Sequence, residues 1–346
     1  MAIQIIKQIP SSEDIFKEFS LSEELQKNIK SDRLEIMNIL AGIDKRLLVI
    51  IGPCSAWPFD STVEYAQKLK SIEAKVKKQI KLIMRVYTQK PRTTTGWTGP
   101  ISQPDPSQPA DFVAGIRYTR SLMLKILETG LPIANEAMFT HDSMKFFPDL
   151  LSWMAIGARS TEDQEHRIYA SSVDCPVGMK NPTSGSVEIG VNSVIAAQGS
   201  HTAIFQGFQI QTSGNPYAHL VLRGGSNGPN YSINDVLKAK KLMNESGITN
   251  PAIMIDVSHD NCKINGKKDV TRQIEIVQET IQNRKINKEA KEVVKGFMIE
   301  SFLKAGSQKI DCPVNGSLDL TGLSVTDPCL GWEETEKLLI NLAENF

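Results

Sequence analysis

Residues 83–96 read IMRVYTQKPRTTTG. The first part is an apolar run with β-branched and aromatic residues, which predicts a buried strand. Pro91 excludes a continuing helix or central strand, and three cations, Arg85, Lys90 and Arg92, stand at the end of the run. Guanidinium and ammonium groups beside a Thr93–Thr95 run suit the binding of phosphate or carboxylate. The stretch alone is also compatible with a solvated basic loop, so its interpretation depends on the rest of the chain.

The same arrangement recurs along the chain, where short runs rich in Val, Ile and Met alternate with amphipathic helical patterns. This alternation is typical of parallel β/α units with both sheet faces covered. Residues 201–213, with Gly207 at a turn, are expected to form a short inserted β-hairpin. Eight units over about 300 residues favour a (β/α)8 TIM barrel over a doubly wound sheet, which would begin with a glycine-rich dinucleotide turn. The expected strands are 46–55, 81–87, 131–137, 153–159, 175–180, 219–225, 252–259 and 293–301.

Two parts of the chain depart from the regular alternation. The helix expected at about 141–150 is short. Residues 1–45 are polar and helical in pattern from Ser22 to Leu40, so we expect an N-terminal extension outside the main fold. It is either a plain surface helix or an oligomer contact or regulatory arm. The catalytic barrel is then expected to occupy residues 46–346.

Composition restricts the classes of partner. The 346 residues hold 39 Lys and Arg against 39 Asp and Glu, so no global basic field points to a nucleic acid. No apolar run approaches the ~18 residues of a membrane span, and the first residues do not resemble a signal peptide. Five scattered cysteines argue for a reducing compartment. We therefore expect a soluble cytoplasmic protein.

Cations stand at the ends of several expected strands. In a TIM barrel the carboxyl ends of all the strands lie at one mouth, which is where the active site is found. Like charges brought together there are unfavourable unless anions occupy the mouth, which points to phosphorylated and carboxylated small molecules. The cations are Arg85, Lys90, Arg92, Arg159, Lys180 and Arg223.

A second group at the same ends consists of Cys54, His259, Glu300 and, in the loop that follows, Asp327. A thiolate, an imidazole and two carboxylates suit a divalent transition metal such as Mn, Fe, Co or Zn. The ligands are far apart in sequence, so this inference depends on the barrel. A metal beside a polyanion pocket favours carbonyl polarisation and aldol-type chemistry. Of the other histidines, His141, His201 and His219 are expected to be structural, and His166 stays open.

Longer motifs carry a resemblance to a known family. They are GPCS (52–55), MRVYTQKPRTTTGW (84–97), AIGARSTEDQEHR (155–167), CPVGMKNPTSG (175–185), LRGGSNGPNYS (222–232), MIDVSH (254–259), MIES (298–301) and SVTDPCLGWEET (324–335). In these motifs the chain resembles the type I 3-deoxy-D-arabino-heptulosonate-7-phosphate (DAHP) synthases, in the subgroup regulated by aromatic amino acids, over nearly its whole length. These transferases condense phosphoenolpyruvate with erythrose 4-phosphate in the first step of the shikimate pathway.

The resemblance implies a role for each site residue. Lys90 would bridge the substrates and protonate the aldehyde oxygen, and Glu136 would manage water near the enol carbon. The implied metal ligands are Cys54, His259, Glu300 and Asp327, and the implied catalytic residues are Lys90, Glu136, Cys54 and His259. The implied phosphoenolpyruvate contacts are Arg85, Lys90, Arg159, Lys180 and Arg223. The implied erythrose 4-phosphate contacts are Lys90, Pro91, Arg92, Thr93 and Asp327.

Two features differ from the family pattern. Ala56-Trp57 follows GPCS where the family usually has Ile-His, which removes a polar group near Cys54. The segment 201–213 is shorter than the family's hairpin, which forms the aromatic amino-acid site together with the N-terminal extension. An aromatic effector is therefore an open expectation, and the resemblance implies a homodimer or homotetramer.

Two other functions compete with DAHP synthesis. A 3-deoxy-D-manno-octulosonate-8-phosphate synthase would use arabinose 5-phosphate, but the run Lys90-Pro91-Arg92-Thr93 favours the four-carbon sugar. A sensor that retains the pocket without turnover is the alternative from another class. The full set of metal-type and anion-type residues argues against it, and the altered Ala56-Trp57 segment is the feature in its favour.

Overall fold

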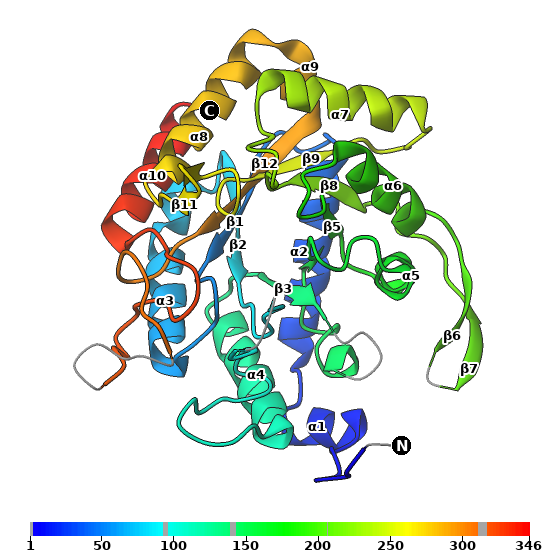
Figure 1. Cartoon of the computed structure of the whole chain (residues 1–346), viewed down its shortest axis with the longest axis vertical. Helices are drawn as coiled ribbons and strands as arrows, with labels where there is room; N and C mark the ends of the chain where they lie inside the picture. The colour runs from blue at the N-terminus through cyan, green and yellow to red at the C-terminus, as the bar shows by residue number, and fades with distance from the viewer. Residues whose placement is uncertain (1–2, 93–95, 139–142, 206, 311–316) are drawn as a thin grey trace.

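The computed structural model describes residues 3–92, 96–138, 143–205, 207–310 and 317–346. Eight parallel strands close into a barrel in the order β1-β12-β9-β8-β5-β4-β3-β2, with helices around it (Figure 1). The predicted (β/α)8 fold is confirmed, and each strand lies within its predicted range except β2, which begins one residue earlier, at Ile80. The strands are β1 Leu47–Gly52, β2 Ile80–Arg85, β3 Ile133–Ala137, β4 Trp153–Ile156, β5 Val177–Lys180, β8 His219–Leu222, β9 Ile253–Asp256 and β12 Val294–Glu300.

The barrel strands are buried on both faces because their side chains alternate between two apolar clusters. In β1, Leu47 and Val49 belong to the cluster shared with the surrounding helices. Leu48 and Ile50 belong to the cluster that fills the barrel interior. A strand buried on both sides needs a continuous apolar run, which is the pattern that the sequence shows.

The helices outside the barrel begin mostly at polar N-caps, for example Asp111, whose side chain accepts from the backbone of Val113 and Ala114. The helix predicted at about 141–150 is wrong for the described residues, which form one short 3-10 helix there, because Pro148 prevents the turn from continuing. These elements are α3 Phe59–Val76, α4 Phe112–Leu127, η1 Ser143–Phe146, α5 Gln164–Ser172, α6 Val187–Gln198, α7 Ile233–Glu245, α8 Arg272–Ile286, α9 Lys288–Val293 and α10 Trp332–Glu344.

The N-terminal region forms α1 Ser12–Glu18 and α2 Glu23–Leu40. Ile36 and Leu40 of α2 pack in the same apolar cluster as the side chains inside the barrel, and α2 lies behind the strands in Figure 1. An ion pair of 2.7 Å between Asp32 Oδ1 and Lys81 Nζ adds to this contact. Helix α2 therefore covers the N-terminal end of the barrel. The boundary at residue 45 stays a prediction.

The inserted hairpin is confirmed as the antiparallel pair β6 Thr202–Phe205 and β7 Phe208–Gln211. Gly207 has φ +83°, which glycine adopts without strain. The hairpin extends away from the barrel in Figure 1, and Ile204 and Phe208 are 79% and 72% exposed. A second short hairpin, β10 Lys263–Ile264 and β11 Lys267–Lys268, follows β9.

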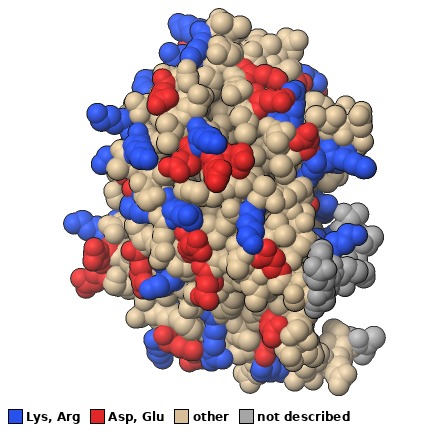
Figure 2. Space-filling view, turned by 90° about the vertical axis from the view of Figure 1, so that its left-hand side faces the viewer, with Lys and Arg blue, Asp and Glu red and all other residues tan. Residues whose placement is uncertain are grey.

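The face shown in Figure 2 carries Lys and Arg interspersed with Asp and Glu. This distribution agrees with the equal numbers of positive and negative side chains in the sequence. Among the described residues, no helix is both long enough and apolar enough to cross a membrane.

Candidate active site

A cavity of about 1040 Å³ opens at the carboxyl ends of the barrel strands. Glu300 at the end of β12 is fully buried and reaches this wall through its contact with Arg85. Thr93 lies outside the described residues. The other predicted site residues all line the cavity, and they are Cys54, Arg85, Lys90, Pro91, Arg92, Glu136, Arg159, Lys180, Arg223, His259 and Asp327.

Three of the four predicted metal ligands lie together. The ligand atoms of Cys54, Glu300 and Asp327 are all within 4.8 Å of one another. The register explains part of this, because Gly52 at the end of β1 pairs with Glu300 and Cys54 follows two residues later. His259 lies outside that triad, but its Nε2 is 3.8 Å from Glu300 Oε1. The structure thus brings the four residues to one corner of the cavity.

Neighbouring groups orient His259. Its Nδ1 lies 2.8 Å from Oδ2 of the buried Asp256, so Nε2 is left toward Glu300. Its backbone has φ +51°, a conformation uncommon for a residue other than glycine. Burial lowers the pKa of the imidazole, which favours the neutral form that a metal requires. Carboxylate support behind a ligating histidine is the usual arrangement in metal sites.

The charges around the triad favour ionised carboxylates. Burial alone would raise the pKa of Glu300, but the charges of Lys268 and Arg85 help to hold it well below its ordinary value. Burial raises the pKa of the Cys54 thiol, so a bound cation would have to displace its proton. A sulfur, a nitrogen and two carboxylate groups at these distances fit a divalent transition metal.

The cations at the mouth are held by buried carboxylates. Arg85 Nη2 donates to Glu300 Oε1 at 3.1 Å, and the guanidinium stacks 4.0 Å from the centre of the Tyr87 ring. Lys180 Nζ lies 3.2 Å from Asp256 Oδ2. Arg85 is 1% exposed, yet its Nε and Nη1 have no hydrogen-bond partner among the described residues. Buried guanidinium donors without a partner are unfavourable, and an anion in the cavity would satisfy them.

The rim of the cavity is formed by the loop after β2. The backbone N–H of Lys90 donates to the Thr98 carbonyl at 2.9 Å, and Arg92 Nε donates to the Trp97 carbonyl at 2.8 Å. These contacts join the two described ends of the predicted anion-binding loop, of which Lys90, Pro91 and Arg92 line the cavity. Trp57, where the family usually has His, packs with Trp97 in a small apolar cluster and does not line the cavity.

The model of the DAHP synthetase I family matches residues 19–340. The chain belongs to this family. It is 42% identical over 334 residues to the Trp-sensitive phospho-2-dehydro-3-deoxyheptonate aldolase of Enterobacter agglomerans, covering 94% of this chain and 92% of the relative. It is 40% identical over 333 residues to the Tyr-sensitive enzyme of Escherichia coli K12, with 95% and 90% covered.

A solved structure agrees with these relatives. The phospho-2-dehydro-3-deoxyheptonate aldolase of Francisella tularensis SCHU S4 superposes with a TM-score of 0.91 at 36% identity, covering 99% of this chain and 98% of that one. The resemblance to DAHP synthases is therefore confirmed. Enzymes of this family catalyse the first step of the shikimate pathway. The relatives are heptonate aldolases, which weighs against the octulosonate alternative.

Sequence reasoning missed several polar residues of this family member's cavity. Lys268 contacts the Asp327 carboxylate and lies 3.7 Å from Glu300 Oε2. Asp256 is an acid within an otherwise apolar strand, and this pattern could have indicated a functional residue. No pattern marked the other residues, because they come from the loops and two-residue strands between β9 and α8. The missed residues that line the cavity are Asp260, Lys263, Lys267 and Lys268, and the missed Asp256 lies behind them, paired with Lys180.

The remaining histidines lie away from the cavity or outside the described residues. His219 accepts from Trp153 Nε1 at 3.2 Å inside the barrel. His201 Nε2 is 2.6 Å from the Ala196 carbonyl, and His166 Nδ1 is 2.6 Å from Asp163 Oδ2. None of these three lines the cavity. His141 lies outside the described residues.

Proposed function

We propose that the cavity at the barrel mouth condenses phosphoenolpyruvate with D-erythrose 4-phosphate and water to give DAHP and phosphate. One observation carries the assignment within the family. The same cavity has two features on its wall. Arg85 and Arg223 have buried guanidinium N–H donors without a partner among the described residues, and Cys54, Glu300 and Asp327 bring sulfur and oxygen ligand atoms together. Phosphorylated substrates and a polarised carbonyl need these two features side by side.

Phosphoenolpyruvate is assigned to the deeper cations. Arg85 and Lys180 are 1% and 3% exposed and approach from β2 and β5, which β3 and β4 separate in the barrel wall. Arg159 and Arg223 line the same cavity, and Lys90 stands between this region and the rim. Charges fixed in a buried site need little reorganisation during the reaction, so these residues serve mainly to position the substrate and to stabilise charge on it.

A divalent cation is assigned to Cys54, His259, Glu300 and Asp327. When bound, it would polarise the aldehyde carbonyl of the second substrate. Asp256 keeps the His259 ring in place, and Ser258 Oγ donates to Glu300 Oε2 at 2.7 Å. These two contacts fix the orientation of the ligating side chains.

Erythrose 4-phosphate is assigned to the rim. Arg92 would bind its phosphate, with Pro91 and Thr93 beside it and Asp327 near its aldehyde end. The Lys90 ammonium would donate a proton to the aldehyde oxygen as C3 of phosphoenolpyruvate attacks the carbonyl carbon. Glu136, 7% exposed in the cavity wall, would hold the water that adds at C2. Phosphate then leaves by cleavage of its C–O bond.

Regulation by an aromatic amino acid is assigned to the hairpin. Two relatives carry names that state sensitivity to Trp or Tyr. A cavity of about 290 Å³ lies between α5 and the hairpin, and Tyr169, Ile204 and Phe205 contribute to its wall. Such a wall suits the ring of an aromatic side chain. Although this hairpin is short, the groove is present.

The exposed apolar residues support a homodimer or homotetramer. Ile204 and Phe208 on the hairpin and Ile5 and Ile6 near the N-terminus are each more than two-thirds exposed. Contact between copies of the chain would cover such surface. The described cysteines are all free, which supports the cytoplasmic location proposed from the sequence.

The deciding experiment follows phosphoenolpyruvate consumption with erythrose 4-phosphate and, separately, with arabinose 5-phosphate. Each reaction is run with EDTA and again after addition of Mn²⁺. We expect metal-dependent consumption with the four-carbon sugar alone, and inhibition by Phe, Tyr or Trp in the active condition. Consumption with arabinose 5-phosphate would favour the octulosonate reaction. No consumption with either sugar by metal-replete protein would favour the sensor.

A further inference from the structure

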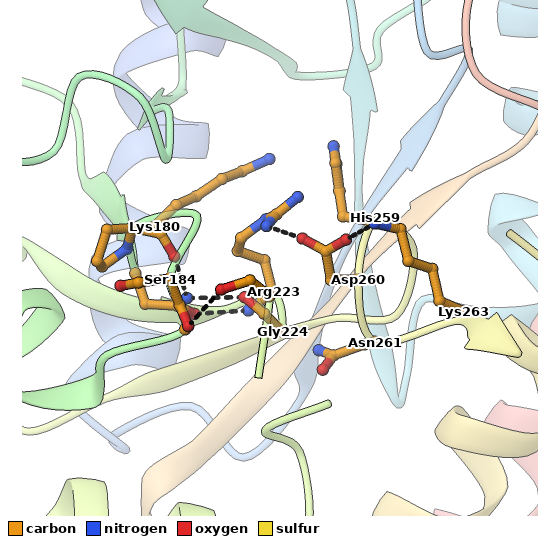
Figure 3. Close-up of polar contacts among 12 residues, drawn as sticks. Lys180, Ser184, Arg223, Gly224, His259, Asp260, Asn261 and Lys263 are labelled. Atoms are coloured by element: carbon orange, nitrogen blue, oxygen red, sulfur yellow. Dashed lines mark hydrogen bonds and ion pairs between the residues drawn. The ribbon is translucent and has the colours of Figure 1, made fainter. Parts of the chain in front are cut away.

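Asp260 is a charged residue at the barrel mouth that has no role in the assignments above. Its two carboxylate oxygens contact different cations, with Oδ2 accepting from Arg223 Nη1 and Oδ1 paired with Lys263 Nζ (Figure 3). All three residues line the cavity. We propose that Asp260 is a positioning residue that fixes the guanidinium of Arg223 for phosphoenolpyruvate. This inference rests on the proposed role of Arg223.

The contact selects one edge of the guanidinium. Asp260 uses Nη1 of Arg223, whereas the buried Nε of Arg223 has no hydrogen-bond partner in the described part of the chain. The edge formed by Nε and Nη2 is one of the guanidinium edges that bind a phosphate or carboxylate with two parallel hydrogen bonds. By holding Nη1, Asp260 leaves that edge for the substrate anion.

The backbone around Asp260 is well anchored, so its carboxylate has a defined position. The Asp260 N–H donates to the Arg223 carbonyl at 3.1 Å. The side-chain amide of the next residue, Asn261, donates through Nδ2 to the carbonyls of Leu222 and Asp256 at 3.1 and 2.8 Å. Gly224 has φ +76°, and a Cβ at this position would collide with the Asn261 backbone. These contacts join the end of β8 to the loop after β9.

Burial makes the pair effective. The Asp260 and Arg223 side chains are 11% and 9% exposed, so water screens their attraction weakly. A long guanidinium side chain without this partner would occupy several rotamers at the mouth. A second explanation is that Asp260 only weakens the positive potential of the mouth. Removing Asp260 would then raise the affinity for phosphoenolpyruvate, whereas the loss of a positioning contact would lower it.

The test compares Asp260→Ala with Asp260→Asn in the Mn²⁺-loaded enzyme. The Asn oxygen still accepts from Arg223 Nη1, whereas Ala removes the acceptor. We expect Asp260→Ala to raise the KM for phosphoenolpyruvate roughly tenfold, the effect of losing one charge-assisted hydrogen bond, with kcat changed less than about threefold. For Asp260→Asn we expect a KM for phosphoenolpyruvate within about threefold of the wild-type value. Calorimetric titration should show that Asp260→Ala binds phosphoenolpyruvate more weakly than Asp260→Asn and the wild type do.

A control variant and a variant of the proposed phosphoenolpyruvate site complete the test. Asp235→Ala removes the capping box of α7, away from the cavity, and should lower Tm without changing either KM. Arg223→Ala tests the proposed phosphoenolpyruvate site itself. If Arg223→Ala raises the KM for phosphoenolpyruvate but neither Asp260 variant does, the positioning role of Asp260 is refuted. The assignment of Arg223 to the phosphoenolpyruvate site then stands. A lower KM in both Asp260 variants would also refute the positioning role, in favour of charge weakening. An unchanged KM in Arg223→Ala would refute the site assignment and the inference with it.

Discussion

His219 gives a quantitative test of how the barrel interior is packed. The residue is 1% exposed, Trp153 Nε1 donates to its Nε2 at 3.2 Å, and its Nδ1 is 2.9 Å from the Tyr217 carbonyl. Both contacts are satisfied by a neutral imidazole that carries its proton on Nδ1. Burial lowers the pKa of His219 from 6.5 to about 4.

The sign of the pH effect follows from this shift. The unfolded chain takes up a proton near pH 6.5, but the folded chain does so only near pH 4. The contribution of His219 to stability is therefore complete above pH 6.5 and decreases as the pH falls toward 4, below which it no longer changes. At 1.36 kcal/mol per pKa unit, the total decrease in the free energy of unfolding is about 3 kcal/mol.

Urea unfolding from pH 7.5 to 4 would measure this effect in the wild type and in His219→Gln. The Gln side chain has an oxygen that can accept from Trp153, and it does not titrate. The variant is expected to be less stable at neutral pH, but its stability should fall about 3 kcal/mol less on acidification. Other titrating groups cancel in the difference between the two proteins. Parallel pH profiles would refute the assignment of a neutral, buried His219.

Four further predictions concern the active site. Cys54→Ala should abolish Mn²⁺-dependent turnover without changing the circular dichroism spectrum, because it removes a proposed metal ligand. Arg92→Ala should raise the KM for erythrose 4-phosphate at least tenfold more than that for phosphoenolpyruvate, as expected for a lost phosphate contact of roughly 1.5–3 kcal/mol. Gly157→Ala places a methyl group against the Glu136 carboxylate and should lower kcat about tenfold or more, measured with both substrates saturating. Lys268→Met removes a positive charge beside the proposed ligands and should tighten Mn²⁺ binding in a calorimetric titration.

Each of these predictions has an outcome that contradicts it. Normal turnover in Cys54→Ala would remove that residue from the metal site. Equal increases in both KM values would refute the role of Arg92. An unchanged kcat in Gly157→Ala would show that the position of Glu136 is not critical, and weaker Mn²⁺ binding in Lys268→Met would mean that the lysine supports the site.

The barrel could be predicted from the sequence because each strand is buried on both faces. Such strands need runs rich in apolar residues, and eight of these runs alternate with helical patterns in the sequence. The residue at the end of a run then lies at the mouth, which is why residues such as Arg85 and Lys180 were found. The hairpin was found in the same way, since Gly207 lies midway between its two strands.

Other features depend on contacts that periodicity does not encode. Asp260 and Lys268 reach the cavity from an irregular loop and a two-residue strand, and their positions are set by hydrogen bonds to distant segments. The helical pattern of residues 22–40 predicted a helix, but not that side chains of α2 pack against those inside the barrel. At 141–150, Pro148 overrode the expected helix.

The position of α2 also bears on the kinetics. Because this helix covers the opposite end of the barrel, the mouth serves as entrance for both substrates and as exit for both products. Arg85 lies at the bottom of this opening, whereas Arg92 lies exposed at its rim. With the proposed assignments, an aldose phosphate bound first would obstruct the deeper site. The architecture therefore favours ordered addition, with phosphoenolpyruvate binding first.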